Sequence, residues 1–244
     1  MLNLLIRRPW TPVASRQVAG WWNPREVLTL SLSGGAVETY RNVIGSALLI
    51  QTTGSRRPVW NGDAFGSGRP GLVFDGMDDR LERPAVPPFA SGADPGEIWA
   101  VVRQDALVAD TGTRIAVSAG SSASNQRAAA RIVASGANRA QAIGRDGTSQ
   151  QFAQDTTVAF GARHVLRCVF DTTSVSLEID GVVTTTVTSA LGTGTGRSAL
   201  GCNAGTTPAN FWNGAIGDVV PVNGRLPPDE AKRMRDYLNW TIGA

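Results

Sequence analysis

Four carboxylates crowd into one short stretch, "GRPGLVFDGMDDRLE" (residues 68–82), at Asp75, Asp78, Asp79 and Glu82. Carboxylates this close together can hold a metal ion, act as acid and base on a sugar, or accept backbone hydrogen bonds in a turn. The spacing does not fit the Asp-x-Asp/Asn-x-Asp/Asn-Gly calcium loop. A Ca²⁺ ion held by Asp78 and Asp79 with loop carbonyls remains the alternative.

The dipeptide Asp75-Gly76 favours an architectural reading of the same stretch. Asp followed by Gly is typical of a turn, and a nearby carboxylate then accepts hydrogen bonds from the backbone amides beyond it. Glu82 has two arginines within reach, Arg80 and Arg83. We therefore predict a turn with no bound metal and no cofactor.

Catalytic patterns elsewhere in the chain are incomplete. Jelly-roll glucanases carry Glu-x-Asp-x-x-Glu, but the segment beginning at Glu178 and Asp180 has Val183 at the second glutamate position. The single histidine, His164, begins an expected strand, and no Gly-x-Ser-x-Gly elbow is present. The stretch "GTGTGRS" (192–198) lacks the lysine of a phosphate loop. These gaps predict no catalytic residues and no enzymatic activity, with a polysaccharide hydrolase or lyase using an unrecognised site as the alternative.

Aromatic faces beside planar polar side chains are the usual means of gripping a sugar. Of the seven tryptophans, we expect Trp99 in the core and Trp240 between helix and sandwich, while Trp21 and Trp22 should send one ring inward and one outward. Two others stand beside loop polar groups, in "VWNGDAFGSGR" and "NFWNGA". The predicted carbohydrate-binding residues are therefore Trp60, Asn61, Asp63, Asn210, Trp212 and Asn213. The alternative is that Trp60 and Trp212 cap the open end of a sandwich.

Composition limits the class of protein. The chain has 244 residues, 42% hydrophobic and only 18% charged, with 28 glycines, which suits an all-β domain with a real core. The net charge is +3, and the arginines are dispersed without a recognisable motif, so we expect no nucleic acid partner. No run approaches the ~20 apolar residues of a membrane span, so we expect no membrane insertion. The start "MLNLLIRRPW" does not resemble a signal peptide, which predicts synthesis in the cytoplasm without one.

The elements follow from hydrophobic periodicity. A near-continuous apolar run over 96–105 predicts a central strand. Strict alternation over 162–187 predicts two successive strands with one face each in the core, and a hairpin turn at Asp180-Gly181 that joins the second of them to a Thr-rich return strand. Cys168 and Cys202 lie in apolar, strand-like runs and are expected to be reduced core thiols, with a disulfide between strands as the alternative.

One helix is expected near the end of the sequence. It begins at Pro228, presents Ala231, Met234 and Leu238 on one face, and ends at Gly243. Residues 1–20 read as an N-terminal arm or a leading strand at the sheet edge, and residues 21–244 as one domain.

Three motifs in register resemble concanavalin A-like (LamG/pentraxin-type) domains. These are "GRPGLVFDGMDDRLE", the hairpin "VSLEIDGVV", and the ending "NGAIGDVVPVNGRLPPDEAKRMRDYLNW". The opening "WWNP" is similar to the family's start, although Asn23 stands where an aspartate is common. The resemblance covers roughly residues 21–242 and implies a two-sheet antiparallel jelly-roll sandwich with one C-terminal helix.

The same resemblance implies a role in carbohydrate or surface binding, frequently on phage tails, head fibres and phage-like particles. The leading expectation is a non-enzymatic module on the particle surface that binds a host glycan, with acidic glycans favoured by the positive charge. Residues 1–20 would anchor it to capsid or tail subunits. A purely structural virion protein without ligand is the alternative, and homo-oligomerisation is left open.

Overall fold

The computed structural model describes residues 10–83, 95–105, 112–122, 125–134, 137–146, 149–156, 158–188 and 197–243. These residues form antiparallel strands and one α-helix, which confirms the predicted all-β sandwich with a C-terminal helix. Short 3₁₀ turns lie at Pro12–Ala14, Val27–Thr29 and Gly54–Arg56. The elements are β1 (Leu30–Ser33), β2 (Ala36–Arg41), β3 (Leu48–Ile50), β4 (Val59–Asn61), β5 (Gly71–Asp75), β6 (Leu81–Arg83), β7 (Gly96–Gln104), β8 (Thr113–Ser122), β9 (Asn125–Ala134), β10 (Ala137–Asp146), β11 (Ser149–Asp155), β12 (Arg163–Phe170), β13 (Ser174–Ile179), β14 (Val182–Thr188), β15 (Arg197–Leu200), β16 (Asn213–Asn223) and α1 (Pro228–Ile242).

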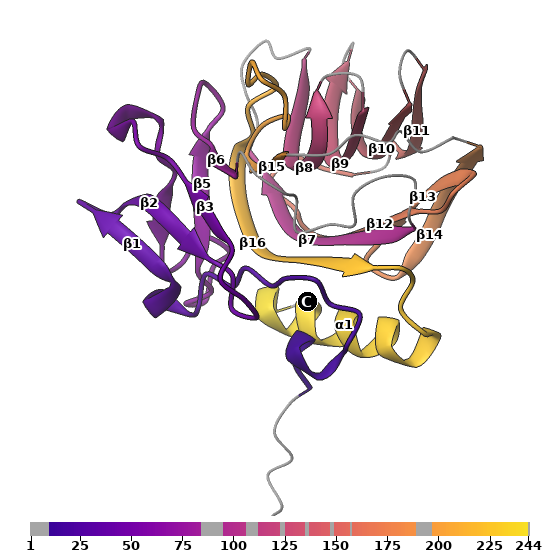
Figure 1. Ribbon diagram of the computed structural model, residues 1–244, viewed down its shortest axis with the longest axis horizontal. Coiled ribbons are helices and arrows are strands. Elements are labelled where there is room, and N and C mark those ends of the chain that lie inside the picture. The colour runs from indigo at the N-terminus through magenta and orange to yellow at the C-terminus, as the bar shows by residue number, and fades with distance from the viewer. Residues whose placement is uncertain are drawn as a thin grey trace, which may run out of the picture.

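The strands form one continuous path that folds over into two layers. Its order is β11-β10-β9-β8-β15-β6-β3-β2-β4-β5-β16-β7-β12-β13-β14, with β1 paired to β2. Figure 1 shows β16, β7, β12, β13 and β14 beneath β15 and β8–β11, with α1 below the lower layer. The two ends of the path meet, because the Gln154 backbone N–H on β11 donates to Thr185 Oγ1 on β14 at 2.6 Å.

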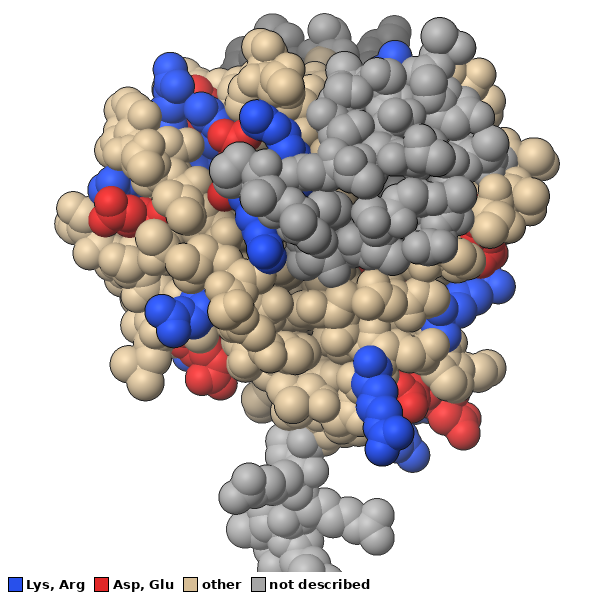
Figure 2. All heavy atoms as spheres, in the orientation of Figure 1, with Lys and Arg blue, Asp and Glu red and all other residues tan. Residues whose placement is uncertain are grey.

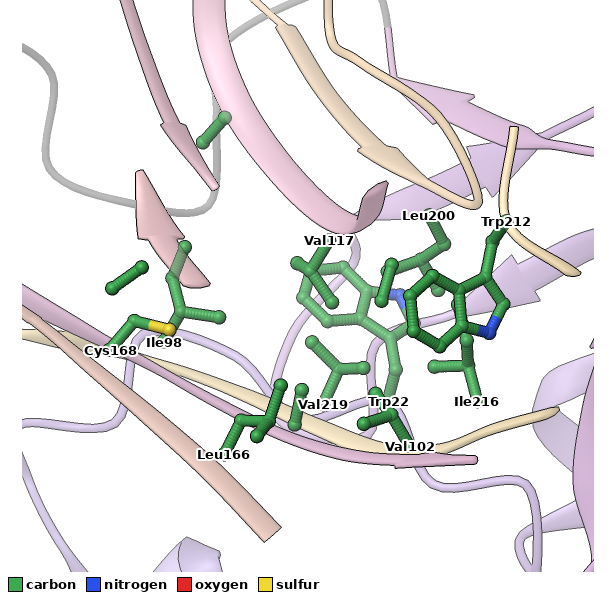
Figure 3. Close-up of a cluster of buried hydrophobic side chains, with 14 of the residues drawn as sticks. Trp22, Ile98, Val102, Val117, Leu166, Cys168, Leu200, Trp212, Ile216 and Val219 are labelled. Atoms are coloured by element: carbon green, nitrogen blue, oxygen red, sulfur yellow. The ribbon is translucent and has the colours of Figure 1, made fainter. Parts of the chain in front are cut away.

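The apolar side chains that alternate along the strands, as predicted, fill the space between the layers. Leu166, Cys168 and Phe170 of β12 are buried in one hydrophobic cluster with Leu177 of β13. Figure 3 shows part of this cluster, where Trp22 and Trp212 lie among aliphatic side chains from several strands. The Asp180-Gly181 turn is confirmed, since both residues have positive φ, 50° and 95°.

A second cluster lies between the lower sheet and α1. Trp99 and Val101 of β7 face the helix side, while Ile98 and Ala100 of the same strand face the sandwich interior. Burial on both faces explains why this strand reads as a continuous apolar run. Trp99 is therefore core, as predicted, but it contacts the helix layer.

Helix α1 has the predicted boundaries and apolar face. Pro228 occupies its first turn, and Gly243 ends it at φ 70°, donating its N–H to Asn239 and Trp240 carbonyls. Ala231, Met234 and Leu238 are buried against the sheet. Among the described residues, no helix is both long and apolar enough to cross a membrane.

The positions of the tryptophans and cysteines agree with the sequence predictions only in part. Trp21 and Trp22 do point to opposite sides, but both are buried because α1 covers the outer side as well. Trp240 does not pack the helix onto the sandwich, since 60% of it is exposed, and that prediction is wrong. Cys168 and Cys202 are buried free thiols, as expected.

The chain before β1 is bound to the sheet. Val18 and Trp22 form isolated bridges with Val222 and Val219 of β16, and the Asn223 N–H donates to the Gln17 carbonyl at 2.8 Å. Residues 17–22 thus lie along β16, and the assignment of residues 1–20 as an arm or a leading strand stays a prediction. Residues 1–9 lie outside the described part of the chain.

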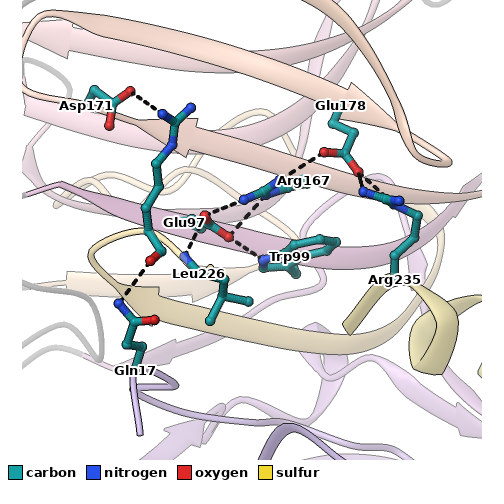
Figure 4. A network of polar contacts seen from close by, with 9 residues as sticks. Gln17, Glu97, Trp99, Arg167, Asp171, Glu178, Leu226 and Arg235 are labelled. Atoms are coloured by element: carbon teal, nitrogen blue, oxygen red, sulfur yellow. Dashed lines mark hydrogen bonds and ion pairs between the residues drawn. The ribbon is translucent and has the colours of Figure 1, made fainter. Parts of the chain in front are cut away.

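A buried chain of alternating charges ties the lower sheet to the helix (Figure 4). Arg167 on β12 contacts Glu97 on β7 at 2.6 Å and Glu178 on β13 at 3.0 Å, and Arg235 on α1 contacts Glu178 at 2.6 Å. The Glu97 side chain is 0% exposed, and its carboxylate also accepts N–H groups from Trp99 and Leu226. Each buried charge therefore has an opposite charge and further hydrogen bonds, which is the condition for tolerating it.

Replacing the central cation should be costly. Arg167→Ala leaves Glu97 and Glu178 facing each other across β12, with Glu97 unpaired in the interior, so we expect a loss of about 3–5 kcal/mol in unfolding free energy. Urea denaturation measures it. The matched control is Lys232→Ala, which removes an exposed i,i+4 pair with Asp236 and should cost about 0.5 kcal/mol or less. Equal losses for both variants would contradict the role given to Arg167.

Candidate functional site

The acidic stretch forms a tight turn after β5. Asp75 Oδ1 accepts backbone N–H groups from Met77, Asp78 and Asp79 at 2.8, 3.3 and 3.4 Å. Asp79 Oδ2 in return accepts the Asp75 N–H at 3.1 Å. This reciprocal pattern is the one expected of carboxylates that shape a turn.

The charges around the turn are partly matched by arginines. Asp78 pairs with Arg56 at 3.3 Å, and Glu82 pairs with Arg80 at 2.7 Å, one of its two predicted partners. Ligand atoms of Asp75, Asp78 and Asp79 lie within 4.8 Å of one another, close enough to share a cation. However, Asp75 Oδ1 and Asp79 Oδ2 already accept backbone hydrogen bonds, so the architectural role is the better supported one.

Asp79 is the member of this group whose pKa is raised. It is buried, and burial together with the negative charges of Asp75 and Asp78 raises its pKa to about 6. Folding therefore makes ionisation of Asp79 less favourable than it is for an exposed aspartate.

The hydrolase-like segment does not present a free acid. Glu178 faces the helix side, where Arg167 and Arg235 both bind its carboxylate. Asp180 accepts the Val165 N–H through Oδ1 at 2.8 Å and contacts His164 Nδ1 through Oδ2 at 2.8 Å. The Glu178 carboxylate is therefore occupied by two arginines and is not presented to a substrate.

The structure divides the six predicted sugar-binding residues into two separate groups. On β5, Gly71 pairs with Asn61 of β4, whereas Asp75 pairs with Asn213 of β16. The two groups thus lie at opposite ends of β5, roughly 13 Å apart along the strand. A single sugar ring cannot contact both groups.

The first of these groups is Trp60, Asn61 and Asp63, and it is built mainly as a turn. Trp60 is half-buried and donates its Nε1–H to the Pro24 carbonyl at 2.9 Å. Asn61 Oδ1 accepts the Asp63 N–H at 2.8 Å, and Asp63 Oδ1 accepts the Gly68 N–H at 2.5 Å. Asn61 and Asp63 remain exposed, so their glycan contact stays a prediction.

The second group is Asn210, Trp212 and Asn213, and burial leaves only part of it accessible to a ligand. Trp212 is 0% exposed and belongs to the core between the layers, so its ring has no face available to a sugar. Asn213 is half-buried and donates to the Asp105 carbonyl at 2.9 Å. Asn210 is exposed with φ 58°, a left-handed conformation that asparagine tolerates.

An open pocket of about 230 Å³ lies on the outer side of α1, and the sequence analysis missed it. Tyr237 packs edge-on against Trp10, with ring centroids 6.4 Å apart, and lies 6.1 Å from Trp240 at 41°. Arg233 and Asp236 complete its lining. The pocket therefore combines aromatic faces with a planar cation and a carboxylate.

A buried ion pair holds this pocket in place. Arg25 reaches over the Tyr237 and Trp240 rings, 5.3 and 5.0 Å from their centroids, and donates to the Tyr237 hydroxyl. Arg25 is itself bound to Asp218 of β16 at 3.3 Å, and Trp21 Nε1 donates to the same carboxylate at 2.8 Å. The N-terminal segment, β16 and α1 thus meet at one network.

Burial perturbs the acid groups of this network. Desolvation raises the pKa of Asp218, while the Arg25 charge and the Trp21 N–H act in the opposite direction. Burial and the Asp218 charge also raise the pKa of Tyr237, which keeps its hydroxyl protonated.

The spacing of four residues along α1 would have allowed this pocket to be predicted from the sequence. Tyr237 and Trp240 are three residues apart, and Arg233 and Asp236 each precede one of them by four, which places all four on neighbouring positions of one helix surface. Trp10 could not be found this way, because it comes from the far end of the chain.

Comparisons with known proteins identify the fold. No protein-family model and no curated protein matches the chain. Domain 4 of AbnA, a GH43 extracellular arabinanase from Geobacillus stearothermophilus in complex with arabinotriose, is similar at TM-score 0.59 and 16% identity, over 91% of this chain and 98% of that one. A Trypanosoma rangeli sialidase in complex with 2,3-difluoro-KDN is similar at TM-score 0.62 and 13% identity, over 93% of this chain and 33% of that one.

The tailspike protein 2 enzymatically active domain of bacteriophage CBA120 is similar at TM-score 0.53 and 12% identity, over 78% of this chain and 30% of that one. The chain therefore spans nearly all of the arabinanase domain but only about a third of the sialidase and tailspike chains. At these identities the matches establish a shared β-sandwich. They do not confirm the concanavalin A-like assignment, which stays a prediction.

The prediction that the protein is not an enzyme is wrong. It rested on the absence of a recognisable catalytic pattern, but the fold recurs in chains described as a sialidase, an arabinanase and an enzymatically active tailspike domain. Missing motifs on this fold are therefore no argument against activity.

Because the pKa of Asp79 is raised, we expect the stability of the protein to depend on pH. The folded pKa of about 6 exceeds the usual 3.8, so between these values the folded protein holds a proton that the unfolded chain does not, and stability falls as pH rises through that window. Asp79→Asn keeps an oxygen to accept the Asp75 N–H and removes the charge. We expect a higher Tm than wild type at pH 7 and little difference at pH 4, measured by thermal unfolding.

Asp78→Asn is the matched control, because that carboxylate is half-exposed and paired with Arg56. It should not raise Tm at pH 7. A destabilised Asp79→Asn at pH 7 would show that the charge is needed, as a bound cation would require.

Proposed function

We propose that this chain is a glycan-recognising domain of a polysaccharide-processing protein on the surface of a phage or phage-like particle. The observation that carries the proposal is the open pocket formed by Trp10, Tyr237 and Trp240 with Arg233 and Asp236. Aromatic faces suit the apolar face of a sugar ring, and the two charged side chains can accept and donate hydrogen bonds to its hydroxyl groups.

The exposure of Trp240 supports this use. An indole that is 60% exposed on a helix surface keeps a large apolar area in water, and nothing in the interior of the fold requires it there. The Asp218–Arg25 pair holds the neighbouring rings in a fixed arrangement, so a ligand would meet a preformed surface.

The comparisons support the class of ligand and the setting. Matches with this fold include an arabinanase domain described in complex with arabinotriose and a phage tailspike domain described as enzymatically active. Figure 2 shows Lys and Arg interspersed with Asp and Glu over the face drawn, so attraction to an acidic glycan would act locally.

Glycan binding by Trp240 can be tested directly. We expect Trp240→Ala to lower affinity about tenfold for the glycans that wild type binds on an array, because it removes a stacking face without touching the core. Trp240→Phe should retain most binding. Leu28→Ala removes another exposed apolar side chain, one that does not line the pocket, and serves as the control.

Trp60→Ala distinguishes the two candidate sites. Loss of binding in this variant together with full binding by Trp240→Ala would move the site to the turn after β4. A wild-type protein that binds no glycan on the array, and releases no product from capsular polysaccharide, would instead favour a purely structural virion protein.

Anchoring to capsid or tail subunits is proposed for the start of the chain. Residues 17–22 pair with β16 and Val18 is buried, so removing residues 1–20 would damage the fold itself. Removing residues 1–9 is the sharper test. We expect an unchanged Tm and loss of incorporation into particles, measured by immunoblotting of purified particles; normal incorporation would refute the anchoring role.

A further inference from the structure

A small polar cavity lies between the two layers, away from the aromatic pocket. Gln104 at the end of β7, His164 near the start of β12 and Trp212 just before β16 share its lining. The other described residues that line it are apolar: Val102, Ala140, Val158 and Leu166. About 10 Å³ is open to the centre of a water molecule, which is room for one.

Polar atoms of these three side chains are buried without a partner. They are Nε2 and Oε1 of Gln104, Nε2 of His164 and Nε1 of Trp212. Gln104 is only 1% exposed, and Trp212 is 0% exposed. A buried polar atom without a hydrogen bond costs about 1–3 kcal/mol, so four of them around one cavity require an explanation.

The contact between His164 and Asp180 fixes what the histidine offers. Asp180 Oδ2 lies 2.8 Å from His164 Nδ1, and Asp180 Oδ1 is held by the Val165 N–H. A carboxylate accepts a hydrogen bond, so in the neutral ring the proton is on Nδ1 and Nε2 carries a lone pair. His164 therefore presents an acceptor to the cavity.

The cavity then offers two donors and two acceptors. Trp212 Nε1–H and Gln104 Nε2–H donate, while His164 Nε2 and Gln104 Oε1 accept. We propose that this cavity binds a single buried water molecule, which donates to the two acceptors and accepts from the two donors. A water molecule makes two to four hydrogen bonds in such sites, which matches the number of unpaired atoms.

Other occupants fit less well. A cation would face two N–H donors, and an anion would face two lone pairs. A sugar ring is far larger than the space. The water would join β7, β12 and the chain entering β16, and this inference does not depend on the proposed glycan pocket.

A high-resolution crystal structure of the wild-type protein tests the proposal. We expect one ordered water within hydrogen-bonding distance of at least three of the four atoms. An empty cavity, or density for an ion or a larger molecule, would overturn it.

Gln104→Leu should change Tm in opposite directions depending on whether the cavity holds water. If the cavity holds water, the variant loses two of its hydrogen bonds, and we expect Tm to fall by about 2–4 °C or more. If the cavity is dry, the variant removes two unsatisfied buried atoms, and Tm should rise. Gln104→Glu keeps one acceptor oxygen and replaces the N–H donor by a second oxygen, and a crystal structure of any variant that folds should show the water with fewer partners.

Discussion

The buried chain Glu97–Arg167–Glu178–Arg235 is the constraint on which the rest of the structure depends. Strands β7 and β12 are covered on both faces, by the facing sheet and by α1, so a charge on the helix side must be matched within the protein. Arg167 provides the match for two carboxylates, and Arg235 brings α1 into the same network. Because Glu97 also accepts the Leu226 N–H, the chain entering the helix is fixed as well. Helix position and strand register are thereby specified together, more narrowly than apolar packing alone would specify them.

A buried carboxylate paired with an arginine also supports the candidate pocket. Asp218 is buried beneath the helix, and its partner Arg25 extends outward across the rings of Tyr237 and Trp240. The buried end of this pair satisfies a charge, while the outer end orders aromatic groups at the surface. An interior electrostatic requirement therefore accounts for a preformed aromatic surface on a helix face that would otherwise be ordinary and solvated.

Local periodicity was sufficient to predict the strands of the hairpin at Asp180-Gly181, the central strand and the helix, because burial on these elements follows fixed repeats of two and 3.6 residues. It failed for Trp212 and Trp240, for different reasons. Trp212 lies two and four residues before Gly214 and Ile216, and so shares the inward face of β16, but its asparagine neighbours suggested a loop. Trp240 is two residues after Leu238, which rotates it by about 200° away from the buried face. The pairing of Trp10 with Tyr237 depends on the tertiary fold, and no local pattern encodes it.

Four carboxylates are buried among the described residues, and they show why a perturbed pKa does not by itself locate a reaction on this fold. Glu97, Glu178 and Asp218 each pair with an arginine, and burial nevertheless raises the pKa of Asp218. The pKa of Asp79 is raised to about 6, a value that would suit a general acid. Yet its carboxylate accepts the Asp75 N–H inside a turn, and the shift follows from burial beside two other carboxylates. The geometry identifies a residue that shapes the backbone, and the more informative surface is the one where aromatic rings remain exposed although the fold does not need them there.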